Sequence, residues 1–138
     1  MLHIVSSIPE WIAGKDIIDI GSGSGLITSC MNVYAKSVDA IDLDEDITKY
    51  LSDRLYDVAT CFDVLEHVTN LSQALNNVML LTKPGGLMIF NQPEQRDLTQ
   101  PLDTVVTLYN LLPVGKLIYL ENYGFSSEES YNFMVFVK

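Results

Sequence analysis

The chain has 138 residues, of which 48% are hydrophobic and 19% charged, a composition typical of one globular domain and not of a disordered chain. Eight Lys and Arg residues against eighteen Asp and Glu residues give a formal net charge of −10. Because affinity for nucleic acids comes largely from basic side chains that contact phosphates, this balance argues against a nucleic-acid substrate.

Cysteine and histidine are too sparse for a metal centre or a disulfide framework. The chain has two of each, and they show no metal-ligand spacing. We therefore expect no metal and reduced thiols. No apolar run approaches the length of a membrane span, and the N-terminus lacks a charged segment before an apolar one. These features predict a cytoplasmic protein that makes no contact with a membrane.

The first predicted elements are a lead-in helix and a buried strand. The helix covers residues 1–13, because Ser7 to Glu10 has capping-box spacing and Pro9 lies in its first turn. Trp11 and Ile12 are expected to pack this helix onto a sheet. The apolar run 16–20 then predicts a strand of a parallel sheet that is covered on both faces.

A glycine-rich turn follows this strand directly. Gly21, Gly23 and Gly25 occupy alternate positions, which lets the backbone turn sharply and approach a ligand. A helix over 26–35 and a strand over 37–41 come next, and Asp42 follows that strand. Asp42 stands 21 residues after Gly21, close to the offset of about 20 at which a strand-end acid meets a ribose hydroxyl.

A nicotinamide dinucleotide is the competing ligand for this strand, turn and helix. Its motif requires a third glycine three positions after the second, but that position is Leu26. No second nucleotide-binding half follows. The spacing therefore disfavours a dinucleotide.

The middle of the chain alternates helices and strands. The elements that we predict there are a helix over 45–54, a strand over 57–62 with an exit turn over 63–68, a helix over 71–82 capped by Asn70, and a strand over 87–90. The apolar residues of the second helix recur at helical spacing at Leu71, Leu75, Val78 and Met79.

The C-terminal part reads as a loop, two helices and two closing strands. The predicted ranges are a loop over 91–103, helices over 104–112 and 116–123 with Gly124 as a C-cap, and strands over 126–131 and 132–137. No repeat or linker interrupts the pattern. We predict one α/β domain over 1–138.

With these motifs in this order, the sequence resembles the class I S-adenosylmethionine-dependent methyltransferases, in particular the small-molecule branch with a Leu-Glu-His turn. Four segments match in order: the glycine motif 19–25, Asp39 to Leu43, Tyr56 to Val68, and Leu81 to Ile89. The resemblance implies a Rossmann-like, mostly parallel sheet with helices on both faces and an antiparallel closing strand at the C-terminus.

The resemblance also assigns cofactor-binding residues for S-adenosylmethionine. It places the methionine end of the cofactor at the glycine turn, the ribose at Asp42, the adenine against Leu43 and the sulfonium beside Phe62. The implied set is Asp19, Gly21, Ser22, Gly23, Gly25, Asp42, Leu43 and Phe62.

One part of the family pattern is shortened. Only 13 residues separate Asp42 from Tyr56, where the family places a helix, a third strand and another helix. We therefore expect the family's strand order without its third strand. Right-handed crossovers then put the 45–54 helix on the face opposite the 26–35 helix. The shortening also removes the acid that binds the adenine amino group, for which Asp53 is the nearest substitute.

The residues leave the chemistry of the acceptor open. Methyl transfer depends largely on alignment, and a base helps only if the acceptor must lose a proton. His67 is the one candidate base, although it could equally fix the strand-exit turn through hydrogen bonds. Tyr109, Leu111 and Leu112 are either an acceptor-site lid or part of an amphipathic core helix.

Two functions follow from these observations. The first is methyl transfer to a small-molecule or carrier-bound acceptor, with the acceptor pocket open, small, or completed by a second subunit or another partner. The second is a catalytically weak or inactive methyltransferase-like binding module. The intact glycine turn favours the enzyme, and the shortened sheet favours the binding module.

Overall fold

The computed structural model describes residues 2–41, 54–62, 71–93, 95–97, 100–102, 115–124 and 130–138. In chain order its elements are α1 (Leu2–Ser7), α2 (Pro9–Ile12), β1 (Asp16–Ile20), α3 (Leu26–Met31), β2 (Ser37–Ile41), β3 (Tyr56–Phe62), α5 (Leu71–Leu81), β4 (Thr82–Pro93), β5 (Gln95–Asp97), β6 (Gln100–Leu102), β7 (Lys116–Gly124) and β8 (Ser130–Val137).

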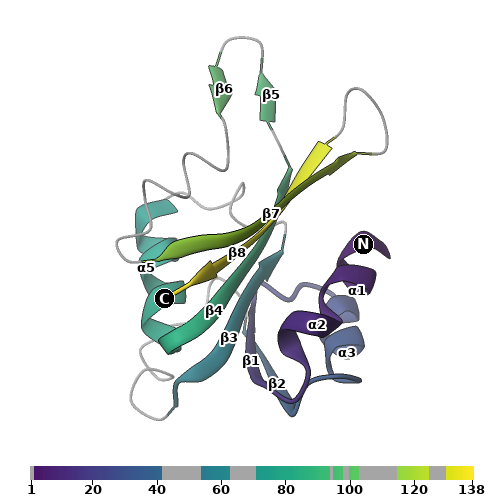
Figure 1. The fold of residues 1–138 in the computed structure, drawn as a ribbon, viewed down its shortest axis with the longest axis vertical. Coiled ribbons are helices and arrows are strands. Elements are labelled where there is room, and N and C mark those ends of the chain that lie inside the picture. The colour runs from purple at the N-terminus through teal and green to yellow at the C-terminus, as the bar shows by residue number, and fades with distance from the viewer. Residues whose placement is uncertain are drawn as a thin grey trace.

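A six-stranded sheet in the order β2-β1-β3-β4-β8-β7 forms the centre of the molecule. The first four strands in this order are parallel, and β8 runs antiparallel between β4 and β7. The predicted fold class and strand order are therefore confirmed. Among the described residues no strand lies outside β2. The short helices α1, α2 and α3 cover one face of the sheet and α5 covers the other (Figure 1).

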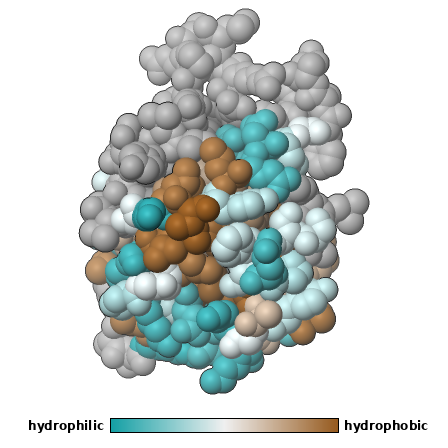
Figure 2. Space-filling view, viewed as in Figure 1, coloured by the Kyte–Doolittle hydropathy of each residue, from teal (hydrophilic) through white to brown (hydrophobic). Residues whose placement is uncertain are grey.

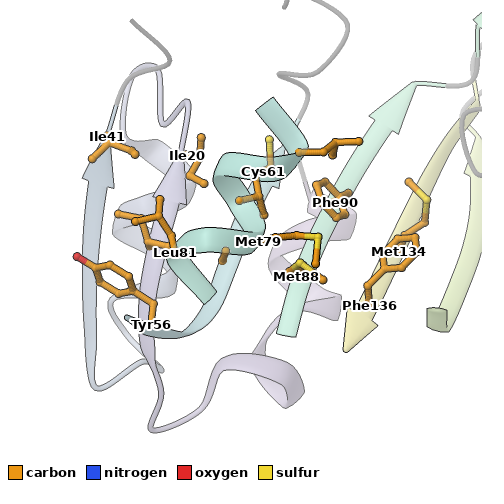
Figure 3. Packing of buried hydrophobic residues seen from close by; sticks show 14 residues of the cluster. Ile20, Ile41, Tyr56, Cys61, Met79, Leu81, Met88, Phe90, Met134 and Phe136 are labelled. Carbon is orange, nitrogen blue, oxygen red and sulfur yellow. The ribbon is translucent and has the colours of Figure 1, made fainter. Parts of the chain in front are cut away.

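Two apolar clusters fill the space on the two faces of the sheet, because successive residues of a strand point to opposite sides. On the α5 face, Leu75, Val78 and Met79 pack over Met88 and Phe90, as the predicted helical stripe requires (Figure 3). On the other face, Ile4 of α1, Ile8 between the two helices and Ile12 of α2 belong to a second cluster.

The N-terminal segment differs from its prediction in one respect. Two helices replace the single helix predicted over 1–13, and Ser7 is the last residue of α1. Ile8 is the N-cap of α2 and makes no side-chain cap hydrogen bond, so the predicted capping box is wrong. Pro9 does lie in the first turn of α2, where its missing N–H is harmless. The expected packing is confirmed: Ile12 is fully buried, and the Trp11 ring lies 5.5 Å from that of Tyr119.

Several boundaries are also corrected. The helix α3 ends at Met31, earlier than predicted. The strand predicted over 87–90 extends from Thr82 to Pro93. Thr82 pairs with Tyr56 of β3 at its start, and β8 pairs with it from Leu87 to Pro93. Within the segment predicted as a loop over 91–103, β5 and β6 form a small antiparallel hairpin, which projects beyond the carboxyl end of β4 (Figure 1).

The largest error concerns the helix predicted over 116–123 with Gly124 as its C-cap. Residues Lys116–Gly124 form the edge strand β7 and pair with β8 along its length. The described closing strands are thus β7 and β8. Of the strand predicted over 126–131, only Ser130 and Tyr131 are described, and they belong to β8. The helices predicted over 45–54 and 104–112, including Asp53 and Tyr109, fall almost wholly outside the described residues.

Alternate residues of β7 are exposed. Ile118 and Leu120 are 44% and 46% exposed, and Figure 2 shows apolar surface on this side of the molecule. A bulge between Leu117 and Tyr119 interrupts the pairing of β7 with β8.

Candidate functional site

The glycine turn leaves the carboxyl end of β1 in a conformation that glycine adopts without strain. Gly21, Gly23 and Gly25 have φ angles of 72°, 55° and 78°, which side-chain-bearing residues rarely adopt. The Gly21 N–H donates to the carbonyl of Ile41 at 2.8 Å, and the Gly25 N–H donates to the carbonyl of Ser22 at 3.0 Å. These bonds tie the turn to the end of β2 and close it on itself.

The space beside this turn is open. A Cβ atom built on Gly23 or Gly25 would meet no atom of the described residues within 4 Å. The backbone angles, and not crowding by neighbouring atoms, are therefore what favours glycine at these two positions.

Asp19 lies immediately below the turn and is held by two threonines. Its side chain is 3% exposed, and its Oδ2 and Oδ1 accept hydrogen bonds from Thr28 Oγ1 at 2.6 Å and Thr60 Oγ1 at 2.8 Å. Burial raises the pKa of this carboxyl group above its ordinary value, although both hydroxyl groups oppose the shift. Asp19 is thus a buried acid supported by neutral donors.

Sequence reasoning found Asp19 but missed both threonines. Thr60 stands opposite Asp19 in the register between β1 and β3, and Thr28 lies one helical turn into the chain after Gly25. A polar residue in the otherwise apolar run 58–62 was the available signal, but its meaning depends on the register.

Phe62 lies beside the glycine turn. In the same register Ile20 pairs with Cys61, so Phe62 lies level with Gly21 at the carboxyl edge of the sheet. Its side chain is 8% exposed. The structure therefore brings Asp19, Phe62 and the turn residues together at one edge.

The remaining predicted site residues, Asp42, Leu43 and His67, lie outside the described residues. Ile41 pairs with Ile20, so β2 ends level with β1 immediately before Asp42 in the chain. Within the part of the chain that the structure describes, no three His, Cys, Asp or Glu side chains are grouped as metal ligands would be. No helix in that part is long and apolar enough to cross a membrane.

Farther along the carboxyl edge, three amide side chains stand directly opposite one another on β4, β8 and β7. We call Gln92, Asn132 and Asn122 the amide row. Asn122 Nδ2 donates to Asn132 Oδ1 at 3.0 Å. Gln92 and Asn132 are 2% and 4% exposed, and Gln92 Nε2 is buried without a hydrogen-bond partner.

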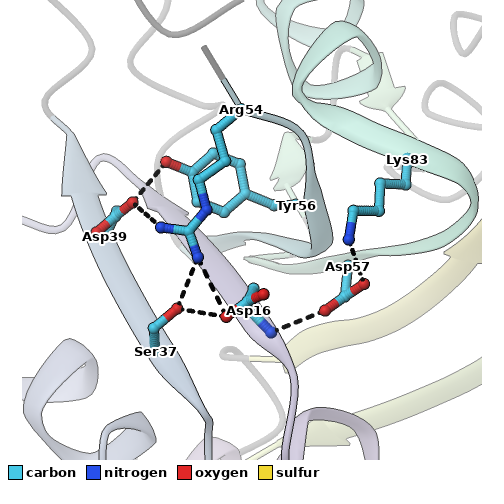
Figure 4. Close-up of polar contacts among 7 residues, drawn as sticks. All are labelled: Asp16, Ser37, Asp39, Arg54, Tyr56, Asp57 and Lys83. Carbon is cyan, nitrogen blue, oxygen red and sulfur yellow. Dashed lines mark hydrogen bonds and ion pairs between the residues drawn. The ribbon is translucent and has the colours of Figure 1, made fainter.

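A second polar cluster lies at the opposite, amino end of the strands, and the sequence analysis did not predict it. We call it the amino-end network (Figure 4). Arg54 contacts Asp16 at 3.1 Å, Asp39 at 3.3 Å and Ser37 at 3.0 Å, and lies 5.0 Å from the centre of the Tyr56 ring. The members of the network are Asp16, Ser37, Asp39, Arg54, Tyr56, Asp57 and Lys83.

This network is internally satisfied. Asp57 accepts hydrogen bonds from the Asp16 backbone N–H and from Lys83 Nζ, both at 3.0 Å. These bonds lower the pKa of Asp57, and the hydrogen bond from Ser37 is the main cause that lowers the pKa of Asp16. Its charges stabilise one another, and nothing in its arrangement indicates a ligand.

The strand order and the glycine turn together define a Rossmann-like α/β domain. Its candidate site lies at the carboxyl edge of the parallel strands, where ligands of such sheets bind. The chain belongs to the methyltransferase domain family, since the sequence model of that family matches residues 4–132. This confirms the resemblance to class I S-adenosylmethionine-dependent methyltransferases. S-Adenosylmethionine is thereby confirmed as the cofactor of the family.

Curated relatives are similar over most of this chain. A ubiquinone biosynthesis O-methyltransferase of Shewanella halifaxensis is 26% identical over 141 aligned residues, which cover 83% of this chain and 59% of the relative. A protein of the same name from Rickettsia felis is 30% identical over 122 residues, 72% of this chain and 50% of the relative. The chain thus spans between half and three fifths of the length of these two relatives.

Solved structures share the fold at lower identity. The N-methyltransferase NodS from Bradyrhizobium japonicum, in complex with S-adenosylhomocysteine, has a TM-score of 0.74 at 17% identity, covering 99% of this chain and 83% of NodS. The [4+2]-cyclase SpnF has a TM-score of 0.75 at 12% identity, covering 99% of this chain and 80% of SpnF.

Proposed function

We propose that this protein transfers a methyl group from S-adenosylmethionine to a small-molecule or carrier-bound acceptor. One observation carries the proposal: a buried carboxylate, Asp19, lies under an open glycine turn at the carboxyl edge of the sheet. Membership of the methyltransferase domain family supports the same function.

In this proposal the chain's own residues hold and orient the cofactor. The backbone of Gly21, Ser22 and Gly23 contacts its methionine end, and the negative field of Asp19 favours the ammonium group. Asp42 and Leu43 bind the ribose and adenine, and Phe62 borders the sulfonium. The cofactor supplies an activated methyl group, so the protein's task is largely to align donor and acceptor.

For the acceptor atom we propose an oxygen, because the curated relatives above are named O-methyltransferases. A hydroxyl acceptor releases its proton as the new bond to carbon forms, and His67 is the candidate base. A second copy of the chain or another partner completes the acceptor side in this proposal. The exposed Ile118 and Leu120 supply apolar surface for such a contact.

Calorimetric titration with S-adenosylmethionine and S-adenosylhomocysteine tests the proposal. We expect both to bind, and Asp42→Ala to weaken the binding because the ribose hydroxyls lose their acceptor. Absence of binding by either compound at millimolar concentration would overturn the proposed function. Unchanged affinity in Asp42→Ala would overturn the placement of the ribose alone.

A binding module without methyl transfer is the second candidate. Two observations favour it: β2 is the outermost described strand on its side of the sheet, and a [4+2]-cyclase shares the fold. This candidate predicts cofactor binding without consumption. Incubation with radiolabelled S-adenosylmethionine and a panel of hydroxylated small molecules separates the two, because only an enzyme releases S-adenosylhomocysteine stoichiometrically with a labelled product.

A further inference from the structure

Gln92 presents a hydrogen-bond donor that the fold does not use. Its side chain is 2% exposed, and its Nε2 is buried with no partner. An unpaired buried amide destabilises a protein, so such groups are rare and require an explanation. One explanation is a ligand that supplies the missing acceptor.

A second donor lies directly beside it. Asn132 faces Gln92 across the pairing of β4 and β8, and it is also buried. Its Oδ1 is occupied by the amide of Asn122, and among the described residues no acceptor contacts its Nδ2. The amide row therefore offers two adjacent neutral donors on the α5 face, the face of Met88 and Phe90.

The position of this pair relates it to the proposed cofactor site. Asn91 pairs with Phe62 at the carboxyl end of β3, so Gln92 lies one residue farther along and one strand away from the residue proposed to border the sulfonium. Neighbouring strands lie about 4.8 Å apart and residues rise about 3.3 Å. Phe62 belongs to the cluster on the face of α1 to α3, whereas Gln92 and Asn132 face α5. A small molecule that reaches both the two donors and the methyl donor must therefore lie across the carboxyl edge of the sheet.

We propose that Gln92 and Asn132 form a subsite that binds a hydroxyl or carbonyl oxygen of the methyl acceptor. The inference rests on the proposed function. The two amides are neutral and have no basic group to offer, so they position the acceptor and take no proton from it. Neutral donors also suit a hydroxyl or carbonyl oxygen better than a phosphate, which favours Lys and Arg.

The other orphan donor on the described chain does not share this arrangement. Trp11 Nε1 is also buried without a partner, but Trp11 lies on the opposite face of the sheet against Tyr119. The hydroxyl of its neighbour Tyr119 already donates a hydrogen bond to Glu121. Trp11 therefore supplies a contrast and not a second site.

The subsite is tested by titrating the ¹⁵N-labelled protein, saturated with S-adenosylhomocysteine, with phenol as the probe and toluene as a control without a hydroxyl. We expect phenol to shift the side-chain amide signals of Gln92 and Asn132, and toluene to leave them unchanged. Amide signals that phenol does not move would overturn the subsite.

Two matched variants sharpen the test. Gln92→Met is expected to weaken phenol binding by about fivefold, the value of one hydrogen bond, and to leave S-adenosylhomocysteine affinity within about twofold. Gln73→Met makes the same change on the exposed side of α5 and should alter neither. Equal phenol affinity in wild type and Gln92→Met would overturn the proposal, and if Gln92→Met does not fold, the wild-type titration decides.

Failure of the subsite and failure of the proposed function remain distinguishable. If S-adenosylhomocysteine binds and phenol leaves the amides unmoved, the subsite is wrong and the function stands. If S-adenosylhomocysteine does not bind, the function is wrong, and a phenol titration of the protein alone then decides whether the subsite exists.

Discussion

The two ends of the same parallel strands differ in how their charged side chains are paired. At the amino end, Arg54 and Lys83 neutralise carboxylates at distances of 3.0 to 3.3 Å, and each contact satisfies another group of the fold. At the carboxyl end, the described hydrogen-bond partners of the buried Asp19 are two threonine hydroxyls, and Gly23 and Gly25 in the turn above it have no described neighbour at the Cβ position. The amino end is thus arranged for stability, and the carboxyl end carries polar groups that bind a ligand in the proposed function, at some cost in stability.

The largest expected effect is the difference in stability between alanine substitutions of a glycine at each end of the strands. A Cβ on Gly86, near the amino end, would lie 2.8 Å from the Asp57 carbonyl oxygen and 2.9 Å from that of Lys83. Because these are backbone atoms, we expect Gly86→Ala to lower the free energy of unfolding by about 3 kcal/mol. Gly23→Ala meets no neighbour and should cost only about 1 kcal/mol through its backbone angle. Urea denaturation of both variants checks this, and equal losses would contradict the comparison.

The next effect concerns the buried acid. We expect Asp19→Asn to weaken S-adenosylhomocysteine binding by about tenfold, because the proposed ammonium partner loses its charge. Its stability at pH 7 should equal or exceed that of the wild type, since the desolvation that raises the pKa of Asp19 is removed. Calorimetry and thermal unfolding measure the two quantities separately. If Asp19→Asn lost both S-adenosylhomocysteine affinity and stability, Asp19 would be a structural residue.

A smaller effect is expected from the amino-end network. Arg54→Met removes contacts to Asp16, Asp39 and Ser37 and should lower the free energy of unfolding by about 1 kcal/mol. Lys83→Met removes one half-exposed pair with Asp57 and should cost only about 0.3 kcal/mol. Urea denaturation of both variants at low and high salt measures these losses. If the losses are electrostatic, the difference between the two variants should shrink at high salt.

The smallest effect is expected in the pH dependence of stability. The carboxyl groups at the two ends of the strands change the free energy of unfolding in opposite directions as the pH rises. The lowered pKa values of Asp16 and Asp57 mean that their stabilisation is present above about pH 4 and is lost as pH falls through their folded values. The raised pKa of Asp19 means that the folded state holds its proton more tightly, so its contribution declines as pH rises from about 4 through its folded value. Between pH 3 and pH 7, the free energy of unfolding should therefore rise more steeply with pH in Asp19→Asn than in the wild type.

The same contrast explains what the sequence could and could not predict. The strands β1, β2 and β3 and the helix α5 carry clear apolar patterns, and the family resemblance supplied the strand order. The segment 116–123 was ambiguous, because Leu117 to Leu120 are apolar without a clear period. It becomes a strand because distant partners on β8 are available, as in the stacked Tyr123 and Tyr131 rings.

Within the site, the residues next to the glycines were predictable from local spacing, whereas their supports were not. Thr60 and Asn132 acquire their roles only through registers that join segments far apart in the chain. The burial that leaves Gln92 without a partner is likewise a property of the packed sheet. Local spacing therefore predicted the glycine turn, and tertiary pairing determined which residues surround it.

The position of β8 has a consequence for synthesis of the chain. This strand comes last among the described elements, yet it lies between β4 and β7, and its residues 132–136 are buried. While the ribosome is still making residues 130–137, β7 has no described neighbour to pair with and β4 has one unpaired edge. Nascent chains stalled before β8 should therefore be far more sensitive to protease than chains stalled well after it has emerged, with an abrupt change between the two.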